Sequence, residues 1–136
     1  MNKRTKTLTV LTSMATIAVL LISMSFSKQE PWEVPAKYKS MKNPIAADDA
    51  SIQAGTMLYK KHCASCHGRT GLGDGVKARQ LETFPGDFSG AAFQDQTDGE
   101  HFYKTKIGRK EMPAYDKKIT DDDIWNIVNY MRTFKK

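Results

Sequence analysis

The sequence predicts an all-α domain over residues 48–136, preceded by an apolar leader and a polar linker. Three segments combine helical spacing of apolar residues with helix-capping residues at their ends, and no alternating strand pattern surrounds the two cysteines. We expect one helix to begin near residue 48, a second to span residues 98–107 and a third to begin at residue 120.

Residues 1–27 are expected to be a signal peptide or an N-terminal membrane anchor. Three basic residues precede residues 8–26, in which thirteen of nineteen residues are apolar and none is charged. This length lies between the apolar region of a signal peptide and a full membrane span, so both alternatives stay open. The basic start places the rest of the chain outside the cytoplasm. We therefore expect the periplasmic side of a bacterial inner membrane, with the protein either anchored or soluble.

Residues 28–47 are interpreted as a polar, proline-containing linker or extended arm, because they show no amphipathic period. Trp32 would either pack this arm onto the domain or mark the membrane surface. Residues 28–136 carry eighteen Lys and Arg against fifteen Asp and Glu, mixed along the chain. Without a basic stripe and stacking aromatics, this charge pattern does not predict a nucleic-acid partner.

The first helix should be capped by Asp48 or Asp49 and run through Tyr59 to the cysteines. Gly55 lies within it, where glycine costs about 1 kcal/mol relative to alanine. The usual compensation is the close approach of another element.

The other two helices have clear ends. The helix over residues 98–107 should stop at Gly108, a natural C-cap. The last helix has Thr120 as N-cap, three aspartates in its first turn and lysines at its end, which suits the helix dipole. One face of it is apolar and comprises Ile124, Ile127, Val128 and Met131.

The segment Cys63-Ala64-Ser65-Cys66-His67 contains both cysteines at the spacing used for c-type haem attachment. In this motif two thiols bind one haem covalently and the following histidine is an axial ligand of the iron. The predicted cofactor is one haem c, attached through two thioethers by Cys63 and Cys66, with His67 as a metal ligand. No catalytic residue is predicted.

Other interpretations of two cysteines at this spacing are weaker. A structural zinc site needs four ligands, and the only further candidates are His62 and His101. Both histidines lie among charged residues and are expected to be solvated. A thioredoxin-like pair would need a βαβ setting. A plain disulfide would not account for His67.

With this motif and these helices, residues 48–136 resemble the class I cytochromes c. The resemblance implies that the N- and C-terminal helices cross around one haem, which would give Gly55 its packing reason. It also implies that a methionine from an intervening loop binds the far side of the iron. The crossing would join Gly55 and Tyr59 to Ile127, Tyr130 and Met131, and Trp125 and Tyr130 resemble the aromatic pair of many bacterial members.

Met112 is the methionine best placed for this role. The other six lie in the leader, in the linker, on the helix that carries the cysteines or in the helix–helix contact: Met1, Met14, Met24, Met41, Met57 and Met131. Pro113 biases Met112 toward an extended backbone. The segment Met112-Pro113-Ala114-Tyr115 resembles the distal loop of the family, so Met112 is the second predicted metal ligand.

The glycine-rich residues 68–75 follow no strand and lack a Walker lysine pattern, so we expect them to turn tightly beside the haem instead of binding phosphate. Relatives often follow Gly-Asp-Gly with a proline whose carbonyl accepts a hydrogen bond from the second ring nitrogen of the axial histidine. Here Val76 stands in that position and its carbonyl would accept the same bond. Pro85 lies too far along the chain for the sequence to assign it this role.

If His67 and Met112 fill both axial positions, the iron has no open site and its task is electron transfer, not catalysis. The sequence then predicts an exported monohaem cytochrome of a respiratory chain. It would carry single electrons between redox partners such as a quinol-oxidising complex and a terminal oxidase or reductase. The alternatives are a haem-bearing subunit fixed in such an oxidase or reductase, or a haem enzyme or gas sensor with an open distal site.

Overall fold

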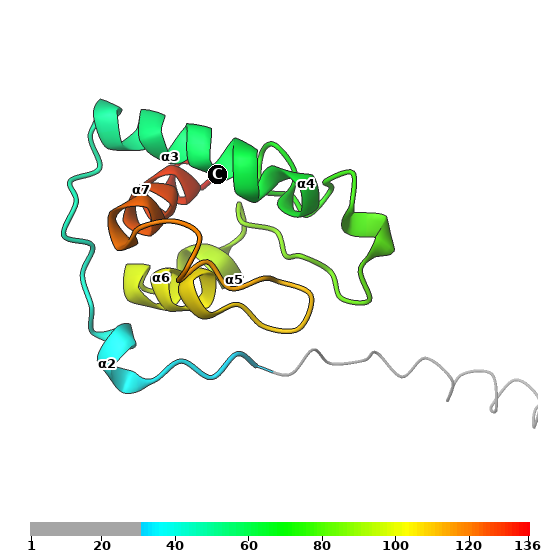
Figure 1. The fold of residues 1–136 in the computed structure, drawn as a ribbon, viewed down its shortest axis with the longest axis horizontal. Helices are drawn as coiled ribbons and strands as arrows, with labels where there is room; N and C mark the ends of the chain where they lie inside the picture. The colour runs from blue at the N-terminus through cyan, green and yellow to red at the C-terminus, as the bar shows by residue number, and fades with distance from the viewer. Residues whose placement is uncertain (1–30) are drawn as a thin grey trace, which may run out of the picture. The chain divides into compact units, whose positions relative to one another are not determined.

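The regular elements of residues 31–136 are helices, in a computed structural model that describes these residues (Figure 1). The leader predicted for residues 1–27 and the first residues of the linker lie outside this part. The elements are α2 (Ala36–Lys39), α3 (Asp49–His62), α4 (Ala64–His67), the 3-10 turn η1 (Ala78–Gln80), α5 (Ala91–Gln94), α6 (Asp98–Ile107) and α7 (Asp121–Arg132). The described residues form no strand, so the all-α prediction is confirmed. Among them, no helix has the length and apolar character needed to cross a membrane.

Local capping explains where the three long helices begin. The Asp48 side chain accepts a hydrogen bond from the backbone of Ser51 at 2.9 Å, at the start of α3. Capping boxes begin α6, between Thr97 and Glu100, and α7, between Thr120 and Asp123. These bonds satisfy backbone N–H groups that a helix start leaves without partners.

Helices α3 and α7 cross at Gly55, as the resemblance to the class I cytochromes c implied (Figure 1). A Cβ atom at this position would lie 2.0 Å from the backbone oxygen of Asn126 and 2.9 Å from the Cβ of Tyr130. One turn further along α3, Tyr59 is fully buried and its ring meets the ring of Tyr130 edge to face at 5.3 Å. The missing side chain of Gly55 therefore lets the two backbones touch.

The core continues from α7 to α6. The ring of Phe102 stacks on Trp125 with centroids 4.1 Å apart, and Ile124 and Val128 are fully buried. Burial of each such side chain stabilises the fold by about 1.5–3 kcal/mol. α7 is therefore packed on two sides, by α3 and by α6.

The arm that precedes α3 packs against α6. Val34 is buried, and the ring of Tyr38 lies 4.6 Å from that of Tyr103. A Cβ at Gly99 would lie 1.9 Å from the backbone oxygen of Tyr38, so α2 rests directly on the α6 backbone. The Trp32 ring lies 4.6 Å from the guanidinium of Arg109. Trp32 thus packs onto the domain, which was one of the two roles expected for it.

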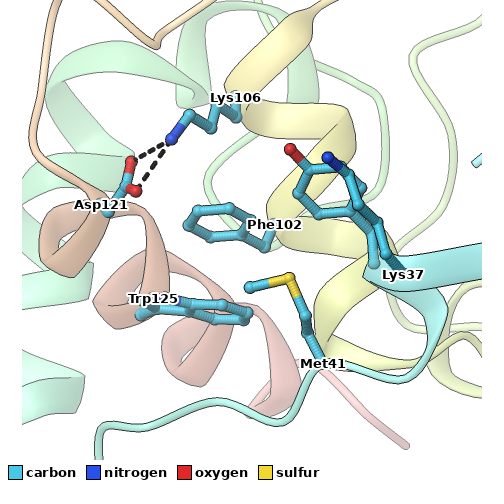
Figure 2. A pocket seen from close by; sticks show the side chains of 7 residues that line it. Lys37, Met41, Phe102, Lys106, Asp121 and Trp125 are labelled. Carbon is cyan, nitrogen blue, oxygen red and sulfur yellow. Dashed lines mark hydrogen bonds and ion pairs between the residues drawn. The ribbon is translucent and has the colours of Figure 1, made fainter. Parts of the chain in front are cut away.

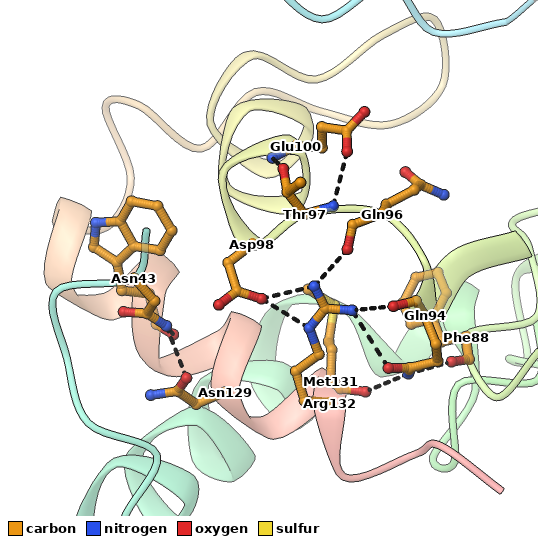
Figure 3. A network of polar contacts seen from close by, with 11 residues as sticks. Asn43, Phe88, Gln94, Gln96, Thr97, Asp98, Glu100, Asn129, Met131 and Arg132 are labelled. Atoms are coloured by element: carbon orange, nitrogen blue, oxygen red, sulfur yellow. Dashed lines mark hydrogen bonds and ion pairs between the residues drawn. The ribbon is translucent and has the colours of Figure 1, made fainter. Parts of the chain in front are cut away.

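Two polar side chains of α7 connect distant segments (Figure 3). Asn129 is 5% exposed; it accepts a hydrogen bond from the Asn43 amide at 2.7 Å and donates to the Ser51 hydroxyl at 2.7 Å. Arg132 binds the Asp98 carboxylate and donates to the backbone oxygens of Gln94 and Gln96. The arm and the α5–α6 connection are therefore both tied to α7.

An open groove of about 440 Å³ lies where the arm meets α6 and α7 (Figure 2). Phe102 and Trp125 form its aromatic floor. An ion pair between Lys106 and Asp121, 2.7 Å long, closes one side. Met41 contributes to the opposite wall and is 37% exposed.

The expectation that His101 is solvated was wrong, since its exposed fraction is 2%. Its imidazole stacks on Phe93 with centroids 4.0 Å apart, and its Nε2 has no hydrogen-bond partner. Burial lowers the pKa of His101 to about 3, and the charges of Arg132 and Lys104 add to this shift, while the Phe93 backbone carbonyl opposes it. The histidine is therefore neutral in the folded protein. His62 is half-buried and meets the Tyr115 ring edge to face.

Gly55→Ala should destabilise the protein by about 2 kcal/mol or more, because the clash with α7 exceeds the gain in helix propensity. Urea unfolding of the purified protein measures this change. Gly90→Ala is the matched control: its Cβ would come no closer than 3.9 Å to another atom, so about 0.5 kcal/mol or less is expected. Equal stability of the two variants would contradict the close crossing.

His101→Leu should make stability less sensitive to acid. In the unfolded chain a histidine takes up a proton near pH 6.5, whereas folded His101 does so only near its pKa of about 3. Between about pH 6.5 and pH 3, protonation of His101 therefore stabilises the unfolded wild-type chain. Above about pH 6.5 the wild type keeps its full stability. Between pH 7 and pH 5 the wild type should lose about 2 kcal/mol more than the variant, measured by urea unfolding. Parallel losses would show that His101 is accessible to protons.

Candidate functional site

Both cysteines and His67 lie at the C-terminal end of α3, where the chain turns into α4. Cys63 ends α3, and its carbonyl accepts hydrogen bonds from the backbone N–H groups of Cys66 at 3.1 Å and His67 at 3.0 Å. Both thiols are free. Burial, followed by the charge of Cys66, raises the pKa of Cys63 to about 12. The turn thus holds the three predicted residues in one short segment, with the Cys63 thiol protonated.

The glycine-rich segment folds back over α4. The N–H groups of Gly73 and Gly75 donate to the carbonyls of His67 at 2.9 Å and Cys66 at 3.2 Å. A Cβ at Gly75 would lie 2.4 Å from the backbone oxygen of Ser65. From the other side, the Tyr59 hydroxyl donates to the Gly68 carbonyl at 2.9 Å. These glycines allow close contact between backbones, in agreement with a tight turn.

His67 is half-buried, and its ring carries a buried polar atom that has no partner. Its Nδ1 has no hydrogen-bond partner, and the ring of Phe88 lies 4.6 Å away. Burial lowers the pKa of His67 to about 4, and the nearby backbone carbonyl of Pro85 opposes this shift. A neutral, half-buried imidazole with an unpartnered nitrogen fits a metal ligand.

The carbonyl beside His67 belongs to Pro85, the residue to which the sequence assigned no role. Val76, which was expected to supply this carbonyl, has 86% of its surface exposed. The residues around Pro85 return to His67 because the backbone N–H of Phe88 donates to the carbonyl of Gly71 at 2.7 Å. This long-range bond has no signal in the local sequence.

Met112 lies in a turn that is tied to the same end of α3. It is half-buried and follows Gly108, where a Cβ would lie 2.5 Å from the Met112 carbonyl oxygen. The hydroxyl of Tyr115 donates to the backbone carbonyl of His62 at 2.7 Å. Burial, followed by the nearby Cys63 and Cys66, raises the pKa of Tyr115 to about 12. The structure therefore brings the predicted distal loop beside the cysteine motif.

The other histidines do not join this group. Among residues 31–136, no cluster of three or more His, Cys, Asp or Glu side chains is arranged to hold a metal ion. His101 stacks on Phe93 and His62 packs on Tyr115. Two free thiols followed by a half-buried, neutral imidazole fit covalently attached haem.

A comparison with protein families agrees with this arrangement. The family model described as cytochrome C oxidase, cbb3-type, subunit III, matches residues 50–131. The chain belongs to this c-type cytochrome family. The match runs from α3 to α7 and includes the cysteine motif and Met112. Membership of the family implies that this cytochrome carries haem c and takes part in haem-based electron transfer.

Two solved structures resemble this cytochrome. One is a chain of the Kuenenia stuttgartiensis reducing HAO-like protein complex Kustc0457/Kustc0458, with 24% identity and a TM-score of 0.63. The match covers 84% of the cytochrome but 54% of that chain, so the cytochrome spans about half its length. The KustC0563 c-type cytochrome has 28% identity and a TM-score of 0.53 over 60% of this chain and 98% of its own. No curated protein matched the sequence.

Proposed function

We propose that the chain is an exported monohaem cytochrome that carries single electrons between proteins of a respiratory chain and transforms no substrate itself. The observation that carries the proposal is the half-buried, neutral His67 with its shielded Nδ1, directly after two free thiols and beside the distal loop. Cys63 and Cys66 would hold one haem covalently, and His67 and Met112 would ligate its iron. When bound, haem c supplies one-electron chemistry at its iron.

The residues around this site have separate tasks. His67 would ligate through one ring nitrogen, while the Pro85 carbonyl accepts a hydrogen bond from the N–H of the other and so fixes the ring. Phe88 packs against the imidazole and excludes water from that side. Tyr115 holds the distal loop near α3 through its bond to His62. If His67 and Met112 both ligate the iron, no position on it would be left for a substrate.

The proposed location is the periplasmic side of a bacterial inner membrane. The apolar residues 8–26 support export, as an anchor or as a cleaved signal peptide. The proposed partners are a quinol-oxidising complex and a terminal oxidase or reductase.

A second candidate is a haem-bearing subunit that stays fixed in a terminal oxidase. The description of the matching family, a subunit of cbb3-type cytochrome c oxidase, favours this candidate. Membranes solubilised in mild detergent, separated on a native gel and stained for haem distinguish the two. A fixed subunit migrates with a large oxidase complex, whereas a carrier migrates alone.

Met112→Ala tests the axial ligation. The oxidised wild type should be low-spin, with the weak red absorption band of sulfur-to-iron charge transfer. The variant should lose this band and, when reduced, bind carbon monoxide more tightly, because the distal position becomes open. Met57→Ala, at a side chain with 62% exposure, should keep the band. An unchanged Met112→Ala spectrum would exclude Met112 as a ligand and favour another distal arrangement.

Cys63→Ser combined with Cys66→Ser tests haem attachment. A domain of this size has a small core, so we expect folding to depend on the bound haem. The double variant should show no haem stain on a denaturing gel and little fixed tertiary structure by NMR chemical-shift dispersion. A well-folded, haem-free double variant would contradict this dependence.

A further inference from the structure

The side chain of Glu111 connects the turn of residues 109–112 to a separate loop that contains residues 82–83. Its Oε1 accepts a hydrogen bond from the backbone N–H of Glu82 at 2.9 Å. Its Oε2 accepts from the backbone N–H and the hydroxyl of Thr83, both at 3.1 Å. A single exposed carboxylate therefore makes three bonds to residues nearly thirty positions earlier in the chain.

The two ends of this connection lie next to the two sides of the proposed haem site. Glu111 directly precedes Met112, the proposed distal ligand. Thr83 lies two residues before Pro85, whose carbonyl faces His67. The carboxylate thus joins the segment that presents the distal ligand to the segment that supports the proximal one.

The turn that Glu111 holds has an unfavourable backbone conformation. Arg109 and Met112 close it with two backbone hydrogen bonds, of 2.9 Å and 3.0 Å. Within this turn Lys110 has a φ of 52°, and no other non-glycine residue among 31–136 has a positive φ. A lysine in the left-handed region is disfavoured, so such a conformation persists only where surrounding contacts impose it. The three bonds of Glu111 are contacts of this kind.

We propose that Glu111 is a positioning residue that keeps Met112 at the distal side of the haem by fixing the turn of residues 109–112 to residues 82–83. This inference rests on the proposed ligation by Met112. Glu111 is not itself a ligand; it acts through the backbone of Met112, the next residue. Its loss leaves the helical core unchanged but allows the turn to open, so Met112 leaves the iron more often.

The test compares Glu111→Ala with Glu82→Gln in the full-length, haem-loaded protein. Glu82→Gln removes one negative charge from the same loop but keeps the backbone N–H that Glu111 binds, so it is a matched control. Thr83→Val removes the hydroxyl bond alone and keeps both backbone donors. Two readouts are measured for each variant: the red sulfur-to-iron band of the oxidised protein on heating, and the rate at which the reduced protein binds carbon monoxide.

Glu111→Ala should bind carbon monoxide about two- to tenfold faster than the wild type, in line with the loss of exposed hydrogen bonds. Its red band should fade at a temperature below that at which helical circular dichroism is lost. Thr83→Val should show a smaller change in the same direction, and Glu82→Gln should match the wild type.

The results separate the two proposals. A wild type without the red band refutes ligation by Met112 and, with it, this role of Glu111. A wild type with the band and an indistinguishable Glu111→Ala overturns the positioning role alone. Simultaneous loss of the band and of helical structure in Glu111→Ala also overturns it, because Glu111 would then support the whole fold. If Glu111→Ala fails to fold, Thr83→Val tests the positioning role by the same two readouts. A Thr83→Val variant that matches the wild type in both would then overturn it.

Discussion

The contact between the backbones of α3 and α7 at Gly55 is the constraint on which the rest of the domain depends. Because α3 is continuous from Asp49 to His62, this contact fixes where its C-terminal end lies, and the cysteine motif begins there. Tyr59 extends the same contact to the glycine-rich segment through its bond to Gly68. Tyr115 ties the distal loop to the same end of α3 through its hydrogen bond to the His62 carbonyl. A crossing of two helices thus positions a site that lies beyond it.

The features that the sequence predicted depend on residues close together in the chain. Thr120 and Asp123 cap α7 across three positions, and Gly108 ends α6 by its own conformation, so both helix ends could be recognised locally. The spacing of Cys63, Cys66 and His67 is equally local. The predicted helix already placed these three residues together at the end of α3. That they bind haem, and that Met112 binds its iron, stay predictions.

The features that the sequence did not predict depend on contacts between distant segments. His101 was expected in solvent because its neighbours in sequence are charged, yet Phe93, from α5, covers its ring. Pro85 approaches His67 because Phe88 binds the Gly71 backbone, and Glu111 reaches Thr83 across the molecule. None of these pairs shares a helix or a turn. Periodicity and capping signals describe one element at a time and carry no information about them.

The attachment of the arm to α6 and α7 determines how short this chain can be made. A fragment cut to the family boundaries, residues 50–131, would lack Tyr38, which covers Phe102, and Asn43, which binds Asn129. The aromatic stack would face water and the Asn129 amide would lose the carbonyls of residues 45 and 46. Such a fragment would expose the apolar face formed by Phe102 and Trp125 and would tend to aggregate. For recombinant work, the smallest well-behaved unit therefore begins before Trp32 and not at the first long helix.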